Sequence, residues 1–185
     1  AVNDAPTLSA TASNPTFTEA AGLGTQAAAV AVFSGANTST IESGQTIKGL
    51  TFTVGGLADG ASETIVVDGT TIALGANSSG TTATNGMAYT VTIVSGTATV
   101  ALTKTAGVST SAINTLINGI TYQDTNTDNP TAGSRTFTLT QIQDSGGTAN
   151  SGADTTTLSV VSTVAVNAVN DAPTLSATAS NPTFT

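Results

Sequence analysis

Residues 135–142 read RTFTLTQI and carry the clearest secondary-structure pattern in the chain. Phe137 and Leu139 alternate with threonines at positions 136, 138 and 140, and the alternation slips one step before Ile142. Strict alternation of apolar and polar side chains is typical of a β-strand with one buried face. The stretch therefore predicts a half-buried strand whose outer face is lined by threonine.

Strand patterns continue on both sides of this stretch. A long final strand is predicted at residues 158–167, with Leu158, Val160, Val164 and Val166 on one face. Asp-Gly at 68–69 and Ser-Gly at 95–96 each separate two strand-like runs, which favours hairpins at these positions. The remaining strand patterns lie at 47–54, 64–67, 71–74, 89–94 and 97–102.

These patterns predict an all-β fold, an enlarged antiparallel β-sandwich. Roughly nine or ten strands with turn signals every 8–12 residues are typical of a sandwich. The short connections leave no room for helical crossovers, which favours antiparallel order. One short helical segment is predicted near 109–117, where apolar residues at 112, 113, 116 and 117 follow a Ser/Thr cap.

An internal repeat sets the domain organisation. Residues 1–18 read AVNDAPTLSATASNPTFT, and residues 168–185 repeat the same eighteen letters at an offset of 167. A unit of this length can bury its own core, unlike the short units of solenoids. We therefore expect residues 1–167 to form one complete repeat and residues 168–185 to begin the next identical one.

The composition excludes several classes of function. The chain has no Cys and no His, so thiol chemistry and the commonest general base and metal ligand are absent. Eleven acidic residues face only Lys48, Lys104 and Arg135, for a net charge of −8. This balance excludes a basic nucleic-acid footprint and makes cations the natural partners. No apolar run approaches the roughly eighteen residues of a membrane-spanning helix, so we expect no membrane insertion.

The boundary sequence Val-Asn-Asp-Ala-Pro offers the first candidate metal ligands. It places Asn3 and Asp4 near the start of the chain, and Asn170 and Asp171 after the final strand. Proline stiffens the link, and hard amide and carboxylate oxygens with no cation nearby suit Ca²⁺. A plain Asx turn before proline is the alternative interpretation.

A second candidate site lies in residues 124–130, DTNTDNP. Oxygen side chains at Asp124, Asn126 and Asp128 match the first three ligand positions of a calcium loop. The Gly and Glu that an EF-hand requires later are missing, because Asn129 and Arg135 stand there. The stretch is either part of a calcium site completed by distant residues or a solvated turn.

Other acids stand at predicted strand ends, where the loops of a sandwich gather. Glu19 and Asp144 are candidate ligands on this ground, and Asp154 shares the position. Asp59 and Glu63 flank a short Gly-Ala-Ser turn, for which a solvated hairpin is the favoured interpretation. Each of these acids has an ordinary exposed turn position as its alternative.

Nothing in the sequence favours an enzyme. A carboxylate pair could hydrolyse a glycoside, but such clefts are lined with aromatics, and the chain has two Tyr, five Phe and no Trp. There is no Gly-x-Ser-x-Gly and no phosphate-binding loop. We therefore predict a non-enzymatic protein.

The chain contains the motifs VNDAP at 2–6 and 169–173, ITYQD at 120–124, and DSGGTANSGADTTT at 144–157. These motifs resemble the cadherin-like repeats of giant, type I-secreted (RTX-type) adhesins of Gram-negative bacteria, and the resemblance implies an Ig/cadherin-like β-sandwich. GLADGASE at 56–63, followed by VDGTTI at 67–72, resembles the middle part of the same repeats. The likeness covers nearly the whole unit, although the chain lacks the fuller acidic linker of true cadherins.

The resemblance implies a secreted extender repeat at the bacterial cell surface, with Ca²⁺ at interdomain junctions and a role in adhesion or biofilm. Neighbouring identical repeats would be its partners, joined covalently or as filament subunits. The alternative is a carbohydrate- or surface-binding module, ice included, which an exposed threonine row at 136, 138 and 140 would favour. The implied calcium ligands are Glu19, Asp124 or Asp128, Asp144, Asn170 and Asp171, with Asn3 and Asp4 at the upstream joint.

Overall fold

Most of the chain is built from β-strands, as the alternating patterns predict. The computed structural model describes residues 2–184. The strands are β1 (Thr7–Ala12), β2 (Thr16–Thr18), β3 (Val30–Ala31), β4 (Phe33–Ser39), β5 (Ile47–Gly55), β6 (Glu63–Val67), β7 (Thr70–Ala73), β8 (Ser78–Thr81), β9 (Ala88–Val94), β10 (Thr97–Val108), β11 (Thr121–Asp124), β12 (Gly133–Asp144) and β13 (Thr155–Asn167). The helices are α1 (Thr110–Asn118) and the 3₁₀ turns η1 (Gly60–Ser62) and η2 (Ala149–Ser151).

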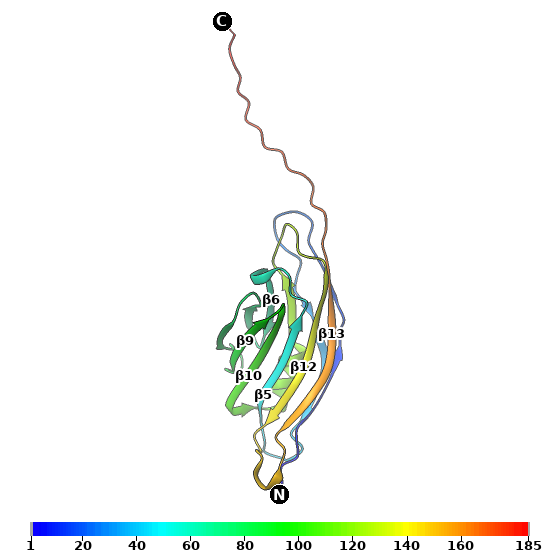
Figure 1. Cartoon of the computed structure of the whole chain (residues 1–185), viewed down its shortest axis with the longest axis vertical. Coiled ribbons are helices and arrows are strands. Elements are labelled where there is room, and N and C mark those ends of the chain that lie inside the picture. Colours follow the sequence, from blue (N-terminus) through cyan, green and yellow to red (C-terminus); the bar gives the residue numbers. More distant parts are fainter. Residues whose placement is uncertain (1, 185) are drawn as a thin grey trace.

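The strands form three sheets. A seven-stranded sheet has the order β2-β13-β12-β5-β10-β9-β8, a four-stranded sheet the order β3-β11-β6-β7, and β1 pairs with β4. Figure 1 shows the long strands β13, β12, β5, β10 and β9 side by side along the molecule. The predicted all-β sandwich with one short helix is confirmed.

One strand pair departs from the predicted antiparallel order. β2 lies parallel to β13, with Thr16 beside Ala165 and Thr18 beside Asn167. These two strands lie far apart in the sequence, so no hairpin joins them and the argument from short connections does not apply to them. The parallel pair attaches the beginning of the chain to its final strand.

The core lies between the sheets and includes three aromatic rings that contact one another in a row. Tyr122 of β11 stands edge-on to Phe17 of β2 and to Phe137 of β12, each at 6.0 Å between ring centroids. All three side chains are fully buried. Edge-to-face pairs of this kind add stability beyond the area they bury, so the cluster fastens the four-stranded sheet to the seven-stranded one.

The predicted turns and helix form where their local chemistry places them. Asp68 and Gly69 both have positive φ, at 50° and 76°, as a tight hairpin between β6 and β7 requires. The Oγ of Ser109 accepts a hydrogen bond from the Ala112 amide at 3.1 Å and begins α1. Neither α1 nor any other helix in residues 2–184 is long and apolar enough to cross a membrane.

The two copies of the repeated segment have different environments. In the first copy, Leu8 and Phe17 are 9% and 0% exposed and belong to β1 and β2. In the second copy, the equivalent Leu175 and Phe184 are 93% and 100% exposed, and residues 168–184 form no strand. Figure 1 shows this second copy running away from the end opposite to the N-terminus. The assignment of residues 168–185 to a following repeat stays a prediction.

Candidate functional site

Acidic residues gather at the end of the molecule where the chain begins. Asn3 is buried and donates through Nδ2 to Asp144 Oδ1 at 3.1 Å and to the Ala153 carbonyl at 2.6 Å. Gln45 donates to Asn3 Oδ1 at 2.7 Å. The neighbouring Asp4 amide donates to Glu42 Oε1 at 3.0 Å, while Asp4 itself is exposed. We call Asn3, Glu42, Gln45 and Asp144 the N-terminal pole.

Three side-chain oxygens of this pole are buried without a hydrogen-bond partner. They are Glu42 Oε2, Gln45 Oε1 and Asp144 Oδ2. A buried carboxylate oxygen normally has a donor or a cation beside it, because its desolvation is otherwise uncompensated. The N-terminal pole therefore offers three hard oxygen ligands to a cation.

The opposite end of the molecule carries a second acidic group. Glu19 is 3% exposed, and its Oε2 accepts a hydrogen bond from the Val169 amide at 2.7 Å. The Gly22 amide donates to Asp171 Oδ1. Glu19 Oε1 and Asp171 Oδ2 are buried and unpartnered, like the oxygens of the first pole. We call Glu19, Gly22, Val169 and Asp171 the C-terminal pole; the exposed Asn170 lies within it in sequence and donates only to the Asp171 carbonyl.

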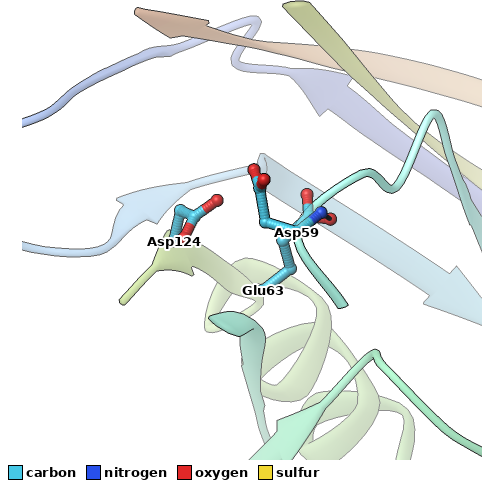
Figure 2. A group of neighbouring side chains, drawn as sticks. All are labelled: Asp59, Glu63 and Asp124. Atoms are coloured by element: carbon cyan, nitrogen blue, oxygen red, sulfur yellow. Dashed lines mark hydrogen bonds between the residues drawn. The ribbon is translucent and has the colours of Figure 1, made fainter. Parts of the chain in front are cut away.

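A third group lies inside the molecule, where Asp59, Glu63 and Asp124 bring their carboxylates within 4.8 Å of one another. Figure 2 shows the three side chains converging from the η1 turn, the start of β6 and the end of β11. Glu63 and Asp124 are fully buried. A solvated hairpin was the favoured interpretation for Asp59 and Glu63, and the burial of Glu63 shows that this was wrong.

Arg135 of β12 neutralises part of this charge. It is 2% exposed, donates through Nε to Glu63 Oε1 and lies 3.3 Å from Asp59 Oδ2 through Nη2. Glu63 also accepts from the Tyr122 hydroxyl at 2.8 Å and from the Ala58 and Asp59 amides at 2.7 and 2.9 Å. Both oxygens of Glu63 are thus fully engaged by protein donors.

The pKa values within this group differ in direction. Burial raises the pKa of Asp124 to about 6, and the neighbouring Asp59 and Glu63 carboxylates act in the same direction. Burial also favours the neutral form of Asp59, but hydrogen bonds from Thr131 and the charge of Arg135 outweigh it and hold the pKa of Asp59 below its usual range. Burial disfavours the charge on Arg135, and Glu63 more than offsets this, so the pKa of Arg135 is raised. The guanidinium remains charged, and Asp124 takes a proton more readily than Asp59.

This internal group could hold a metal ion, but Asp124 is the member of the group with a carboxylate oxygen that accepts no hydrogen bond. Asp124 Oδ1 accepts from the Asn126 amide at 2.9 Å, whereas Oδ2 is buried with no partner. Asp59 already accepts from the Thr131 amide and hydroxyl at 2.7 and 2.5 Å. A cation here would bind between Asp124 and Asp59, with Glu63 held back by its donors.

The predicted calcium loop at residues 124–130 is divided by the fold. Asp124 points into the internal group, while Asp128 is exposed and lies outside it. Asn126 Oδ1 accepts from the Asp128 amide at 3.1 Å and the Asn129 amide at 3.3 Å. These are the hydrogen bonds of an Asx turn. Of the three predicted ligands, Asp124, Asn126 and Asp128, only Asp124 therefore remains a candidate, and the loop does not form a calcium site by itself.

Sequence reasoning did not identify Glu42, Gln45 or the Arg135 network. Glu42 and Gln45 stand in a Ser/Gly-rich connection with no strand pattern, so nothing local marks them. Arg135 had a usable signal, because it shares the inward face of β12 with Phe137 and Leu139. A charged residue on an apolar face needs a buried partner, and this could have been inferred.

The predicted exposed threonine row at 136, 138 and 140 is not seen, because all three residues are half-buried. The outer face of the seven-stranded sheet carries one row of threonines that runs across the strands instead. Thr138 of β12 pairs with Thr53 of β5, which pairs with Thr99 of β10, which pairs with Thr92 of β9. Thr99 and Thr92 are exposed, and Thr138 and Thr53 half-buried. Thr140 is not part of this row. It lies at the register shift between β12 and β5, and its hydroxyl donates to the Thr51 carbonyl at 3.0 Å.

A hollow of about 350 Å³ lies beside β5 and β10 and is lined by both lysines of the chain, Lys48 and Lys104, together with Gln143, threonines and small residues. Its lining contains no carboxylate. It therefore offers no acid–base pair for hydrolysis.

No family model, characterised protein or solved structure matches this chain. The likeness to adhesin repeats accordingly stays a prediction from the sequence motifs.

Proposed function

We propose that the chain is a structural extender repeat of a secreted bacterial surface adhesin, and that calcium stiffens its junctions with identical repeats. The observation that carries the proposal is the different use of the two identical Val-Asn-Asp stretches. The copy at residues 2–4 contacts Asp144 and Glu42, and the copy at 169–171 contacts Glu19 and Gly22.

In a tandem array a single Val-Asn-Asp stretch would make both sets of contacts. Asp171 of one repeat would also be the Asp4 of the next, so the C-terminal pole of one repeat and the N-terminal pole of the next would meet across three residues. Four carboxylates would gather there, each with one buried oxygen that lacks a partner: Glu19, Asp171, Glu42 and Asp144.

The charge of such a junction supports calcium as the bound cation. Both ion pairs among the described residues involve Arg135, which lies in the interior, and neither involves a residue of the two poles. Four carboxylates without a protein cation repel one another, and hard oxygen ligands in this number suit Ca²⁺. Binding would neutralise the junction and hold the two repeats in one orientation.

The placement of the two ends supports an extended array. Asn3 lies beside Ala153 at the start of β13, whereas the chain leaves β13 at Asn167 beside Thr18. Figure 1 shows the chain entering at one end of the long axis and leaving at the other. Each added repeat would therefore lengthen the molecule and hold an adhesive part away from the cell surface, with no enzymatic role.

The decisive experiment is small-angle scattering on a protein of four tandem repeats, in calcium and in chelator. We expect a rod-like profile with calcium and a more flexible one in chelator. A control with Glu19→Gln and Asp144→Asn in every repeat should be equally flexible in both conditions. The same flexible profile for the unmutated protein in both conditions would remove calcium-stiffened junctions.

The row of threonines across β12, β5, β10 and β9 supports surface binding as a second candidate function. Neighbouring strands place these hydroxyls about 4.8 Å apart, a regular spacing that suits an ordered surface such as ice or a crystalline glycan. Retention on ice and on polysaccharide should fall in a double variant in which Thr99 and Thr92 are both replaced by lysine. Thr71→Lys, at an exposed position on β7 of the other sheet, should have no effect. Equal retention of the unmodified protein, the double variant and the control variant would exclude this candidate.

A further inference from the structure

One row of residues across the seven-stranded sheet has small side chains at its centre. The strand registers place Gln143 of β12 beside Gly49 of β5, Gly49 beside Thr103 of β10, Thr103 beside Ala88 of β9, and Ala88 beside Thr81 of β8. Register partners point to the same face of a sheet. The other four residues line the hollow of about 350 Å³, and Gly49 among them has no side chain that would fill it.

The two lysines stand next to this row, where two neighbouring strands are irregular. The register of β5 with β12 skips Lys48, which makes this residue the extra one of a β-bulge. At the same place the register of β5 with β10 skips residues 104–107 of β10. A bulge bends its strand and changes the direction in which its side chains point. The two irregularities therefore bring Lys48 and Lys104 to one hollow, which both of them line.

The ammonium group of Lys104 is held in place by the turn between β8 and β9. Its Nζ donates to the Asn85 carbonyl. Asn85 is held in turn by the buried Asp68, which accepts from the Asn85 amide at 2.9 Å and from Asn85 Nδ2 at 2.5 Å. The Thr82 hydroxyl also donates to Asp68, at 2.5 Å. A turn fastened to a buried carboxylate fixes the ammonium group before a ligand arrives, which lowers the entropic cost of binding.

The positive charge of this hollow is not neutralised by the protein. Within residues 2–184 both ion pairs belong to Arg135, so neither lysine is paired with a carboxylate. The hollow nevertheless collects both lysines of a chain whose net charge is −8. Two ammonium groups on one hollow repel each other and attract an anion. The hollow is therefore a local anion-binding surface on an acidic protein.

The rest of the lining suits a sugar better than a bare anion. Three threonines bring hydroxyl groups. Gln143 donates through Nε2 to Asp154 Oδ2 at 3.0 Å, which leaves its Oε1 to accept from a ligand, 3.5 Å from where a Cβ of Gly49 would stand. The volume lies within the roughly 300–1,000 Å³ of small-molecule sites. The lining contains no aromatic ring on which a nucleobase could stack.

We propose that this hollow binds an acidic sugar unit, a pyranose that carries a carboxylate or a sulfate group. The acidic group lies between Lys48 and Lys104, and the sugar hydroxyls contact the threonine hydroxyls and Gln143 Oε1. In an array every repeat carries the hollow, so an acidic polysaccharide is held at many points and a weak single site suffices. The proposal goes beyond the calcium junctions and is independent of them.

The experiment measures binding of short oligosaccharides to the full chain by isothermal titration calorimetry, in chelator and at low salt. The probes are oligogalacturonate, a sulfated galactan oligosaccharide, a neutral galactan oligosaccharide of the same length, and inorganic sulfate. We expect at least one acidic oligosaccharide to bind at least about tenfold more tightly than the neutral one and than inorganic sulfate, and to bind more weakly as salt is raised. The tighter of the two acidic probes identifies the acidic group. Binding of neither, or of inorganic sulfate as tightly as of the oligosaccharides, would overturn the proposal.

Substitution of the lysines locates the binding. Lys48→Gln and Lys104→Gln should each weaken it by about tenfold, whereas arginine at both positions keeps the charge and should keep most of the binding. Thr71→Lys, at an exposed position of the other sheet, returns one charge to the double glutamine variant away from the hollow and should not restore binding. The melting midpoint checks that every variant is folded. Glutamine variants that bind like the unmodified protein, or restoration by Thr71→Lys, would also overturn the proposal.

Discussion

At the scale of single residues, Arg135 lies between Glu63 and Asp59 with 2% of its side chain exposed. Replacing it by methionine would leave the buried Glu63 and the half-buried Asp59 carboxylates without their cation. We expect Arg135→Met to lower the free energy of unfolding by about 3–5 kcal/mol, measured by chemical denaturation at neutral pH. Adding Glu63→Gln to that variant removes one uncompensated charge and should restore part of the loss. A cost below about 1 kcal/mol for the single change would contradict this account.

Asp124 should give the protein an unusual dependence of stability on pH. Its pKa is about 6 in the folded protein and near its ordinary value, about 3.9, in the unfolded chain, so the folded state holds the proton more tightly. Stability should therefore fall as pH rises from about 4 to 6, by at most about 3 kcal/mol.

Asp124→Asn mimics the protonated acid and should abolish this dependence and raise stability at pH 7, measured by urea denaturation in chelator across this range. The exposed Asp128→Asn is the matched control and should leave the dependence in place. A difference in stability between the unmodified protein and Asp124→Asn that stays constant from pH 4 to 6 would rule out a raised pKa at Asp124.

The acids of the candidate sites lie where the strand alternation would place apolar side chains. Glu63 shares the buried face of β6 with Ile65, and Asp124 shares that of β11 with Tyr122. Asp144 is likewise buried with Ile142 at the end of β12. The pattern could thus predict which acids are buried. It could not predict that Glu63 meets Arg135, because that pairing depends on how two sheets pack.

At the scale of elements, Gly146 determines how closely Asn3 approaches β12. A Cβ at this position would lie 2.0 Å from Asn3 Oδ1, so any side chain would displace Asn3 from Asp144. We expect Gly146→Ala to cost about 1–3 kcal/mol of stability, measured by thermal or urea denaturation. Gly24→Ala, where a Cβ meets nothing within 4 Å, is the control and should be nearly neutral. Equal effects of the two substitutions would mean that Asn3 is not held against β12.

The elements with strong local signals were predicted well and the others were not. The hairpins at 68–69 and 95–96, the helix capped by Ser109 and the final strand all formed as expected. The strands β3, β4, β8 and β11 were missed. β3, β8 and β11 have only two to four residues, and the sequence of β4, FSGANTS, carries no recognisable alternation. The parallel pairing of β2 with β13 was also missed, since partners so far apart in sequence leave no local trace.

At the scale of the whole molecule, the proposed junction predicts a calcium response that depends on the number of repeats. In this chain the two poles lie at opposite ends, so each pole holds only two of the four carboxylates that would meet at a junction. A protein of two tandem repeats would bring Glu19 and Asp171 of the first repeat to Glu42 and Asp144 of the second. Because tighter binding to the folded state stabilises it further, the two-repeat protein should respond to calcium more strongly than the single chain.

The measurement is the melting midpoint of both proteins in calcium and in chelator. At a calcium concentration about a hundredfold above the Kd, binding at one site adds about 2.7 kcal/mol, which corresponds to a rise of roughly 5–10 °C for a domain of this size. We expect a rise of this order for the two-repeat protein and a smaller one for the single chain. Glu19→Gln in the first repeat alone should reduce the rise, whereas Glu19→Gln in the second repeat alone, away from the junction, should not. Equal rises for the one- and two-repeat proteins would place the calcium within the repeat, at the Asp59, Glu63 and Asp124 group, because that group is complete in a single chain.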